Sequence, residues 1–159
     1  MVGAQRARGG DQPIEMAYSG LLAGNADAGL AAVTAALDLA RRERSLFYEP
    51  ELHRLDGALH AAAGRADVAE ACLRRGLAVA REQGSRTLEL RIATELARIA
   101  VHPAAAAEAR ALVATARAGF EEGHGTRDLL EAVAVLAPAA QAMTPEAASA
   151  STSTPSPTR

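Results

Sequence analysis

The sequence predicts an all-α protein in which helical hairpins stack in a row. Apolar residues make up 49% of the 159 residues, yet aromatic residues make up only 3%, and much of the apolar share is alanine. Alanine is the strongest helix former and buries little area, so this composition favours helices packed at close range. No stretch alternates apolar and polar positions with β-branched residues, so no strand is predicted. The third observation is an internal repeat of about forty residues.

Glycine and proline mark the borders of the first four predicted helices. Gly24 and Asn25 end the first helix and precede the second. Pro50 lies in the first turn of the third helix, where a missing amide hydrogen costs little. Gly64 and then Gly84 end the third and fourth helices, because glycine readily adopts the left-handed conformation of a helix terminus. These signals predict helices at residues 13–23, 26–44, 48–63 and 65–83.

Similar signals delimit three further helices. Pro103 begins the sixth helix and separates it from the fifth, and Gly123 ends the sixth. Thr126 followed by Asp128 is typical of an N-cap with an acid in the first turn. The expected helices are 86–101, 103–122 and 126–137, which completes a helical repeat domain at 12–137. A Gly- and Arg-rich leader at 1–11 and a Ser/Thr/Pro-rich tail at 138–159 are expected to be disordered.

The internal repeat appears when the chain is shifted against itself by forty residues. Val33, Leu73 and Val113 then coincide, and Gly57 meets Ala97. A small residue such as Gly57 lets two helices approach closely, and we expect Leu73 to fill the gap between neighbouring hairpins. One hairpin cannot cover its own apolar face, so three stacked pairs would form a continuous core, as in helical solenoids. The alternative is a compact bundle in which alanine richness produces these coincidences by chance.

Charge and cysteine content exclude several classes of protein. All seventeen positive charges are arginine, and the net charge of −2 argues against a general nucleic-acid binder. The single cysteine, Cys72, excludes a disulfide framework and favours a reduced compartment. No apolar run is long enough to cross a bilayer, and no secretory signal follows Arg6 and Arg8. We therefore expect a cytoplasmic protein that binds neither nucleic acid nor membrane.

No catalytic, cofactor-binding or metal-binding residue is predicted. His53 and His60 share a helix face with Glu49, but two helical turns, about 10 Å, separate the histidines, which is too far for one ion. Cys72 has Ala69 and Leu73 nearby, so we expect a packed core cysteine and not a nucleophile. The glycines do not cluster as a phosphate cradle. The chain is therefore expected not to be an enzyme.

Small and large residues at helix-packing positions resemble a known repeat family. Gly57, Gly64, Ala69, Leu73 and Gly76 follow the spacing of a tetratricopeptide repeat, although the second helix continues further than usual. The resemblance implies a short right-handed solenoid of about three hairpins with a repeat near forty residues.

Longer segments resemble a more particular group. Residues 48–59, 69–75 and 86–91 are similar to the C-terminal solenoid of large bacterial signalling ATPases, especially those with a class III adenylate or guanylate cyclase domain, and of related helix-turn-helix regulators. This resemblance spans about 26–136 and implies a non-catalytic protein-interaction or regulatory module of bacterial signalling. The chain has no lysine for a phosphate-binding loop, no cyclase aspartate pair and no DNA-reading helices. A remnant or fragment of such a cyclase, ATPase or regulator is therefore the alternative.

The resemblance also implies a partner surface. In tetratricopeptide stacks the first helix of each pair lines the concave face, and counting from the small residues Gly57 and Ala97 selects six positions. Three arginines and one acid make the expected groove basic, which suits an acidic peptide, a protein or an adjoining signalling domain. The alternative is that these arginines only solvate an exposed face. The six expected groove residues are Glu51, Arg54, Ala58, Arg91, Thr94 and Arg98.

Overall fold

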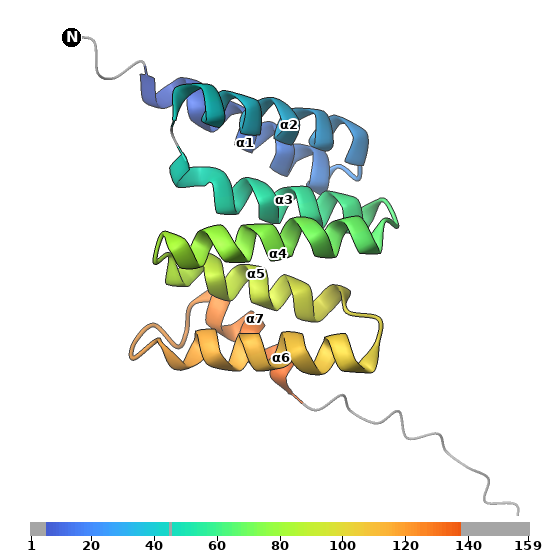
Figure 1. Ribbon diagram of the computed structural model, residues 1–159, viewed down its shortest axis with the longest axis vertical. Helices are drawn as coiled ribbons and strands as arrows, with labels where there is room; N and C mark the ends of the chain where they lie inside the picture. The colour runs from blue at the N-terminus through green and yellow to red at the C-terminus, as the bar shows by residue number, and fades with distance from the viewer. Residues whose placement is uncertain (1–5, 45, 138–159) are drawn as a thin grey trace, which may run out of the picture.

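The computed structural model describes residues 6–44 and 46–137, and within these residues it contains helices and no strand. The prediction of an all-α protein is therefore confirmed. The bounds of these helices are α1 (Arg6–Leu22), α2 (Ala26–Glu43), the 3-10 helix η1 (Leu46–Tyr48), α3 (Glu49–Ala62), α4 (Ala66–Glu82), α5 (Arg86–Ile99), α6 (Pro103–Ala118) and α7 (Arg127–Leu136). Helices α1 to α6 run in alternating directions in a stack, and α7 lies across α5 and α6 at a steeper angle (Figure 1).

Two helix ends differ from the prediction by more than two residues. Helix α1 begins at Arg6, so residues 6–11, which we expected in a disordered leader, are helical. Extending an existing helix needs no new nucleation, which is why a segment without apolar periodicity can continue it. Helix α6 ends at Ala118, before Gly119, and the next residue, Phe120, packs against the apolar cluster of α5, α6 and α7. Residues 1–5 and the expected tail at 138–159 lie outside the described residues.

The turn between α3 and α4 shows how the sequence ends a helix. Gly64 has a φ of 74°, in the left-handed region where a side chain is strained. The amide of Arg65 donates to the carbonyl oxygen of His60 at 2.9 Å, and the amide of Gly64 donates to that of Ala61 at 2.9 Å. This pattern is the Schellman motif, so the chain reverses within a few residues and α4 packs back along α3.

Close approach of α3 and α4 depends on two glycines. A Cβ atom added at Gly57 would lie 2.6 Å from Cγ of Leu73, and one added at Gly76 would lie 2.9 Å from Cβ of His53. Leu73 itself has no exposed surface and joins the apolar cluster of α4, α5 and α6. The predicted roles of Gly57 and Leu73 are confirmed.

Residues related by the forty-residue shift occupy comparable places in the core. Val33, Leu73 and Val113 are all fully buried. Val33 lies in the cluster of α1, α2 and α3, Leu73 in that of α4, α5 and α6, and Val113 in that of α5, α6 and α7. These three positions, spaced forty residues apart, are therefore all buried between helices.

The helices pack differently on the two sides of the stack. Helix α3 contacts α1 and α5, and α5 also contacts α7, in addition to the contacts between chain neighbours. Among the described residues, α2 does not contact α4, and α4 does not contact α6. The odd-numbered helices α1, α3, α5 and α7 therefore form one continuous side of the molecule. None of the helices in 6–44 and 46–137 has the length and apolarity needed to span a membrane.

Candidate functional site

The odd-numbered helices enclose a groove with a volume of about 440 Å³. Every residue that lines it belongs to α1, α3, α5 or α7, so the groove follows directly from the contacts between these four helices. We call this surface the odd-helix groove. It is lined by Tyr18, Leu21, Leu22, Arg54, Arg91, Thr94, Glu95, Arg98, Arg127, Asp128 and Glu131.

The structure brings four of the six expected groove residues together. Arg54, Arg91, Thr94 and Arg98 line the odd-helix groove, although the Thr94 hydroxyl already donates to the carbonyl oxygen of Leu90 at 2.8 Å. Glu51 lines a second cavity, of about 410 Å³, that adjoins the groove. Ala58 is buried and lines neither cavity, because its short side chain lies within the helix packing.

Arg54 is held in a buried polar cluster between α1 and α3. Its Nε and Nη2 atoms donate to the two Glu51 carboxylate oxygens at 3.0 and 2.8 Å, and Nη2 also donates to the Tyr18 hydroxyl at 2.9 Å. The Tyr18 hydroxyl donates to Glu51. Burial lowers the pKa of Arg54, but the hydrogen bonds to Glu51 outweigh this effect, so the pKa of Arg54 is raised overall. Arg54 therefore connects two helices, and with 13% of its side chain exposed it offers little surface to a partner.

Two arginines of α5, Arg91 and Arg98, face acids from their own helix and from α7. Arg91 Nε lies 2.8 Å from Asp128 Oδ2, and Arg98 lies 3.2 Å from Glu95 and 2.9 Å from Glu131. The hydrogen bond with Asp128 raises the pKa of Arg91. The pairs of Arg91 with Asp128 and of Arg98 with Glu131 join α5 to α7 within the lining of the groove.

The expectation of a basic groove is wrong. Four arginines line it, but three acids line it as well, and Glu51 neutralises Arg54 from its edge. The counting that selected the groove residues covered only two helices, so it missed Asp128 and Glu131 on α7. Glu95 could have been found, because it lies four residues after Arg91 and three before Arg98, on the same helical face. The groove is nearly balanced in charge.

Arg91 and Arg98 nevertheless keep donors for a partner. Each side chain is 41% exposed. Arg91 uses only Nε in its pair with Asp128, and among the described residues its two terminal nitrogens have no hydrogen-bond partner. A guanidinium carries five N–H donors, so such a group can bind a second carboxylate without losing the first.

An apolar cavity of about 410 Å³ continues the groove beyond Arg91. It shares Tyr18 and Arg91 with the odd-helix groove and is lined further by Phe47 and Tyr48. Phe47 is 75% exposed, and its ring meets that of Tyr48 edge to face, with 5.1 Å between centroids. Exposed aromatic rings beside charged groups are common at protein interfaces. Neither aromatic residue was predicted from the sequence to belong to a binding site.

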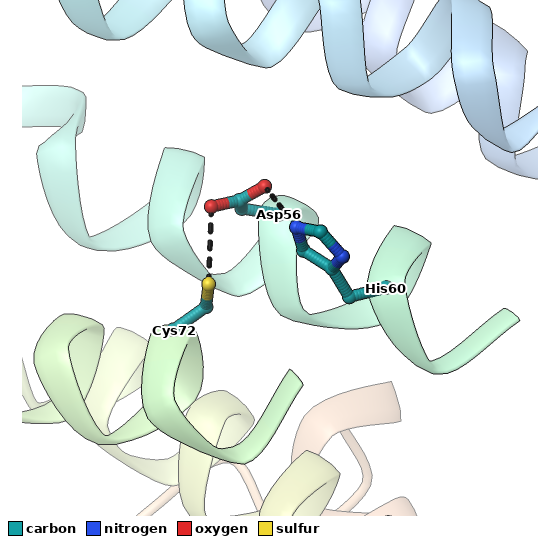
Figure 2. Close-up of side chains that lie close together, drawn as sticks. All are labelled: Asp56, His60 and Cys72. Atoms are coloured by element: carbon teal, nitrogen blue, oxygen red, sulfur yellow. Dashed lines mark hydrogen bonds and ion pairs between the residues drawn. The ribbon is translucent and has the colours of Figure 1, made fainter. Parts of the chain in front are cut away.

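A polar cluster lies between α3 and α4, away from the groove lining. Figure 2 shows the Asp56 carboxylate between the imidazole of His60 and the thiol of Cys72. The thiol donates to Asp56 Oδ2 at 3.1 Å, and His60 Nε2 lies 3.5 Å from Asp56 Oδ1. The expectation of a core cysteine is wrong, because Cys72 is only partly buried and has a polar partner.

The pKa of the Cys72 thiol argues against a nucleophilic role. Partial burial and the hydrogen bond to Asp56 together raise this pKa to about 12. A nucleophilic cysteine needs the opposite environment, with a cation or an imidazole beside the sulfur to favour the thiolate. Here the Asp56 carboxylate lies beside the sulfur instead, and it disfavours the thiolate.

Comparisons of the chain with protein-family models, with curated proteins and with solved structures found no match.

Proposed function

We propose that this chain is a non-catalytic helical-repeat module, a short tetratricopeptide-like right-handed solenoid, that binds a protein partner along the odd-helix groove. The observation that carries the proposal is the groove itself, which four helices line together and which presents partly exposed arginines. The resemblance to the solenoids of bacterial signalling ATPases supports a regulatory role in signalling.

The expected partner is an extended peptide or an exposed segment of another protein that carries both carboxylates and an apolar side chain. Arg91 and Arg98 have the exposure to bind carboxylates, whereas the Arg54 side chain is only 13% exposed. Phe47 and Tyr48 offer an apolar contact in the cavity that adjoins the groove at Arg91. Because the groove also holds acids, a partner with evenly spread negative charge would be repelled at Glu95 and Glu131, so carboxylates placed near Arg91 are favoured.

Selection of peptides displayed on phage against the purified chain tests this proposal. We expect enrichment of sequences that combine Asp or Glu with an aromatic or aliphatic residue. The double variant Arg91→Gln/Arg98→Gln should weaken the selected peptides by about tenfold or more, since a charge-assisted hydrogen bond contributes about 1.5–3 kcal/mol. Arg54 stays unchanged in this test because it holds α1 to α3.

The matched control is Arg41→Gln/Arg42→Gln, which removes the same charge from exposed positions on α2. This variant should bind the peptides as the parent does. Equal weakening in both double variants would mean that net charge alone attracts the peptides and that the groove is not the binding surface. Circular dichroism of each variant verifies that its helices are intact.

A further inference from the structure

Three side chains of different ligand type converge between α3 and α4. Asp56 and His60 lie one turn apart on α3, and Cys72 reaches them from α4. Each offers one possible ligand atom, an oxygen, a nitrogen and a sulfur, and these atoms all lie within 4.8 Å of one another. The convergence depends on the tight α3–α4 packing at Gly57, because Cys72 is the residue before Leu73, which fills that contact.

The distances fit a small metal ion. Zinc is held at about 2.0–2.3 Å by oxygen, nitrogen and sulfur ligands, so two ligands of one tetrahedral ion lie about 3.3–3.6 Å apart. The Asp56–Cys72 distance of 3.1 Å and the Asp56–His60 distance of 3.5 Å are close to these values. The ligand atoms of the third pair, His60 and Cys72, lie within 4.8 Å of each other, so side-chain rotation is needed to bring all three atoms onto one ion.

The set of ligand atoms selects the class of ion. Thiolate and imidazole ligands favour zinc and similar transition ions, whereas magnesium and calcium prefer oxygen alone. The His60 nitrogen that faces the cluster is Nε2, which lies 3.5 Å from Asp56 Oδ1. The three side chains are partly exposed, so an ion can enter from solvent and keep a water molecule as its fourth ligand.

We propose that Asp56, His60 and Cys72 form a binding site for one zinc-class divalent cation that clips α3 to α4. Binding releases the proton of the Cys72 thiol to solvent, so that the sulfur coordinates as a thiolate with no change in oxidation state. The site is independent of the odd-helix groove, and its test does not depend on a partner protein.

Titration of the untagged, reduced protein with Co²⁺ tests the site. We expect one Co²⁺ per chain, the thiolate-to-cobalt charge-transfer band in the near ultraviolet, the intense visible bands of tetrahedral cobalt, and displacement by Zn²⁺. Cys72→Ser should abolish the charge-transfer band. His60→Gln and Asp56→Asn should each weaken binding by about a hundredfold, because even the loss of a hydrogen-bond partner behind a ligand costs about 10- to 100-fold.

His102→Gln and His124→Gln are matched controls, since both histidines are exposed and lie on other parts of the chain. They should bind Co²⁺ as the parent does. Zn²⁺ should also raise the unfolding temperature of the parent and of both controls, but not that of Cys72→Ser. The proposal is overturned if binding is not saturable, if bound Co²⁺ gives no charge-transfer band, or if Cys72→Ser and Asp56→Asn bind as tightly as the parent.

Discussion

His53 is an ionisable side chain buried in the contact between α3 and α4. Only 2% of it is exposed, and among the described residues neither ring nitrogen has a hydrogen-bond partner. Burial lowers the pKa of His53, an effect opposed by Glu49 and Asp56 and supported by Arg75. A histidine in the unfolded chain has a pKa of about 6.5. Just below that pH the unfolded state therefore takes up a proton at this position, while folded His53 stays neutral.

This difference predicts that acid destabilises the protein through His53. As pH falls below about 6.5, the unfolded state gains a proton that the folded state resists, so the free energy of unfolding should decrease by up to about 1.4 kcal/mol per pH unit. Urea unfolding from pH 7.5 to 5 measures the slope. His53→Leu should flatten it, while His124→Gln should leave it unchanged. If the free energy of unfolding of His53→Leu still falls as steeply with pH, other groups cause the effect.

Leu73 illustrates the energetic weight of one buried side chain. It has no exposed surface and lies where α3, α4 and the next hairpin meet. Leu73→Ala should lower the free energy of unfolding by about 2–4 kcal/mol, because it leaves a cavity that neighbours fill incompletely. Val68, on the same helix but exposed, provides the control, and Val68→Ala should change stability by less than about 0.5 kcal/mol. Urea unfolding measures both changes, and similar losses of unfolding free energy in Leu73→Ala and Val68→Ala would contradict this packing.

At the scale of helices, the α3–α4 pair depends on the absence of a side chain. A Cβ at Gly57 would meet both Leu73 and, at 3.1 Å, the backbone oxygen of Ala69, which cannot rotate away. Gly57→Leu should therefore destabilise the protein by at least about 1–3 kcal/mol, even though leucine is the better helix former by nearly 1 kcal/mol. Gly125 has open space around it, so Gly125→Leu should be well tolerated. Thermal unfolding of the two variants provides the comparison.

Helix α7 is attached to the stack by both apolar and charged contacts, which differ in strength. Leu129 is 2% exposed in the cluster with α5 and α6, whereas Asp128 pairs with the partly exposed Arg91. We expect Leu129→Ala to cost about 2–4 kcal/mol and to expose α7 to proteolysis. Asp128→Asn should cost only about 0.2–1 kcal/mol, since exposed ion pairs contribute little. Equal losses would show that the ion pairs, not the apolar face, hold α7 in place.

At the scale of the whole molecule, unequal packing on the two sides creates the candidate binding surface. Contacts from α1 through α3 and α5 to α7 bring residues from four helices into one groove, while α2, α4 and α6 contact only helices adjacent in the chain. No single hairpin forms the groove, because its lining residues come from four helices. Its polar side chains are already paired across helices, so a partner must fit an existing charge pattern.

The sequence by itself determined the helical class, most helix borders and the close contacts at Gly57 and Leu73. These features depend on local signals, namely capping residues, helix propensity and the spacing of small and large side chains along one helix. The expectation that Arg91 and Arg98 line a groove came from the resemblance to tetratricopeptide stacks, in which the first helix of each pair lines the concave face.

Only the tertiary structure decided what those residues meet. Arg91 and Asp128 are 37 residues apart, Arg98 and Glu131 are 33 apart, and Asp56 and Cys72 are 16 apart. Their contacts depend on how one helix is rotated and shifted against another, which the pattern within a single helix does not specify. For this reason the charge balance of the groove and the convergence of Asp56, His60 and Cys72 emerge only when the helices are packed.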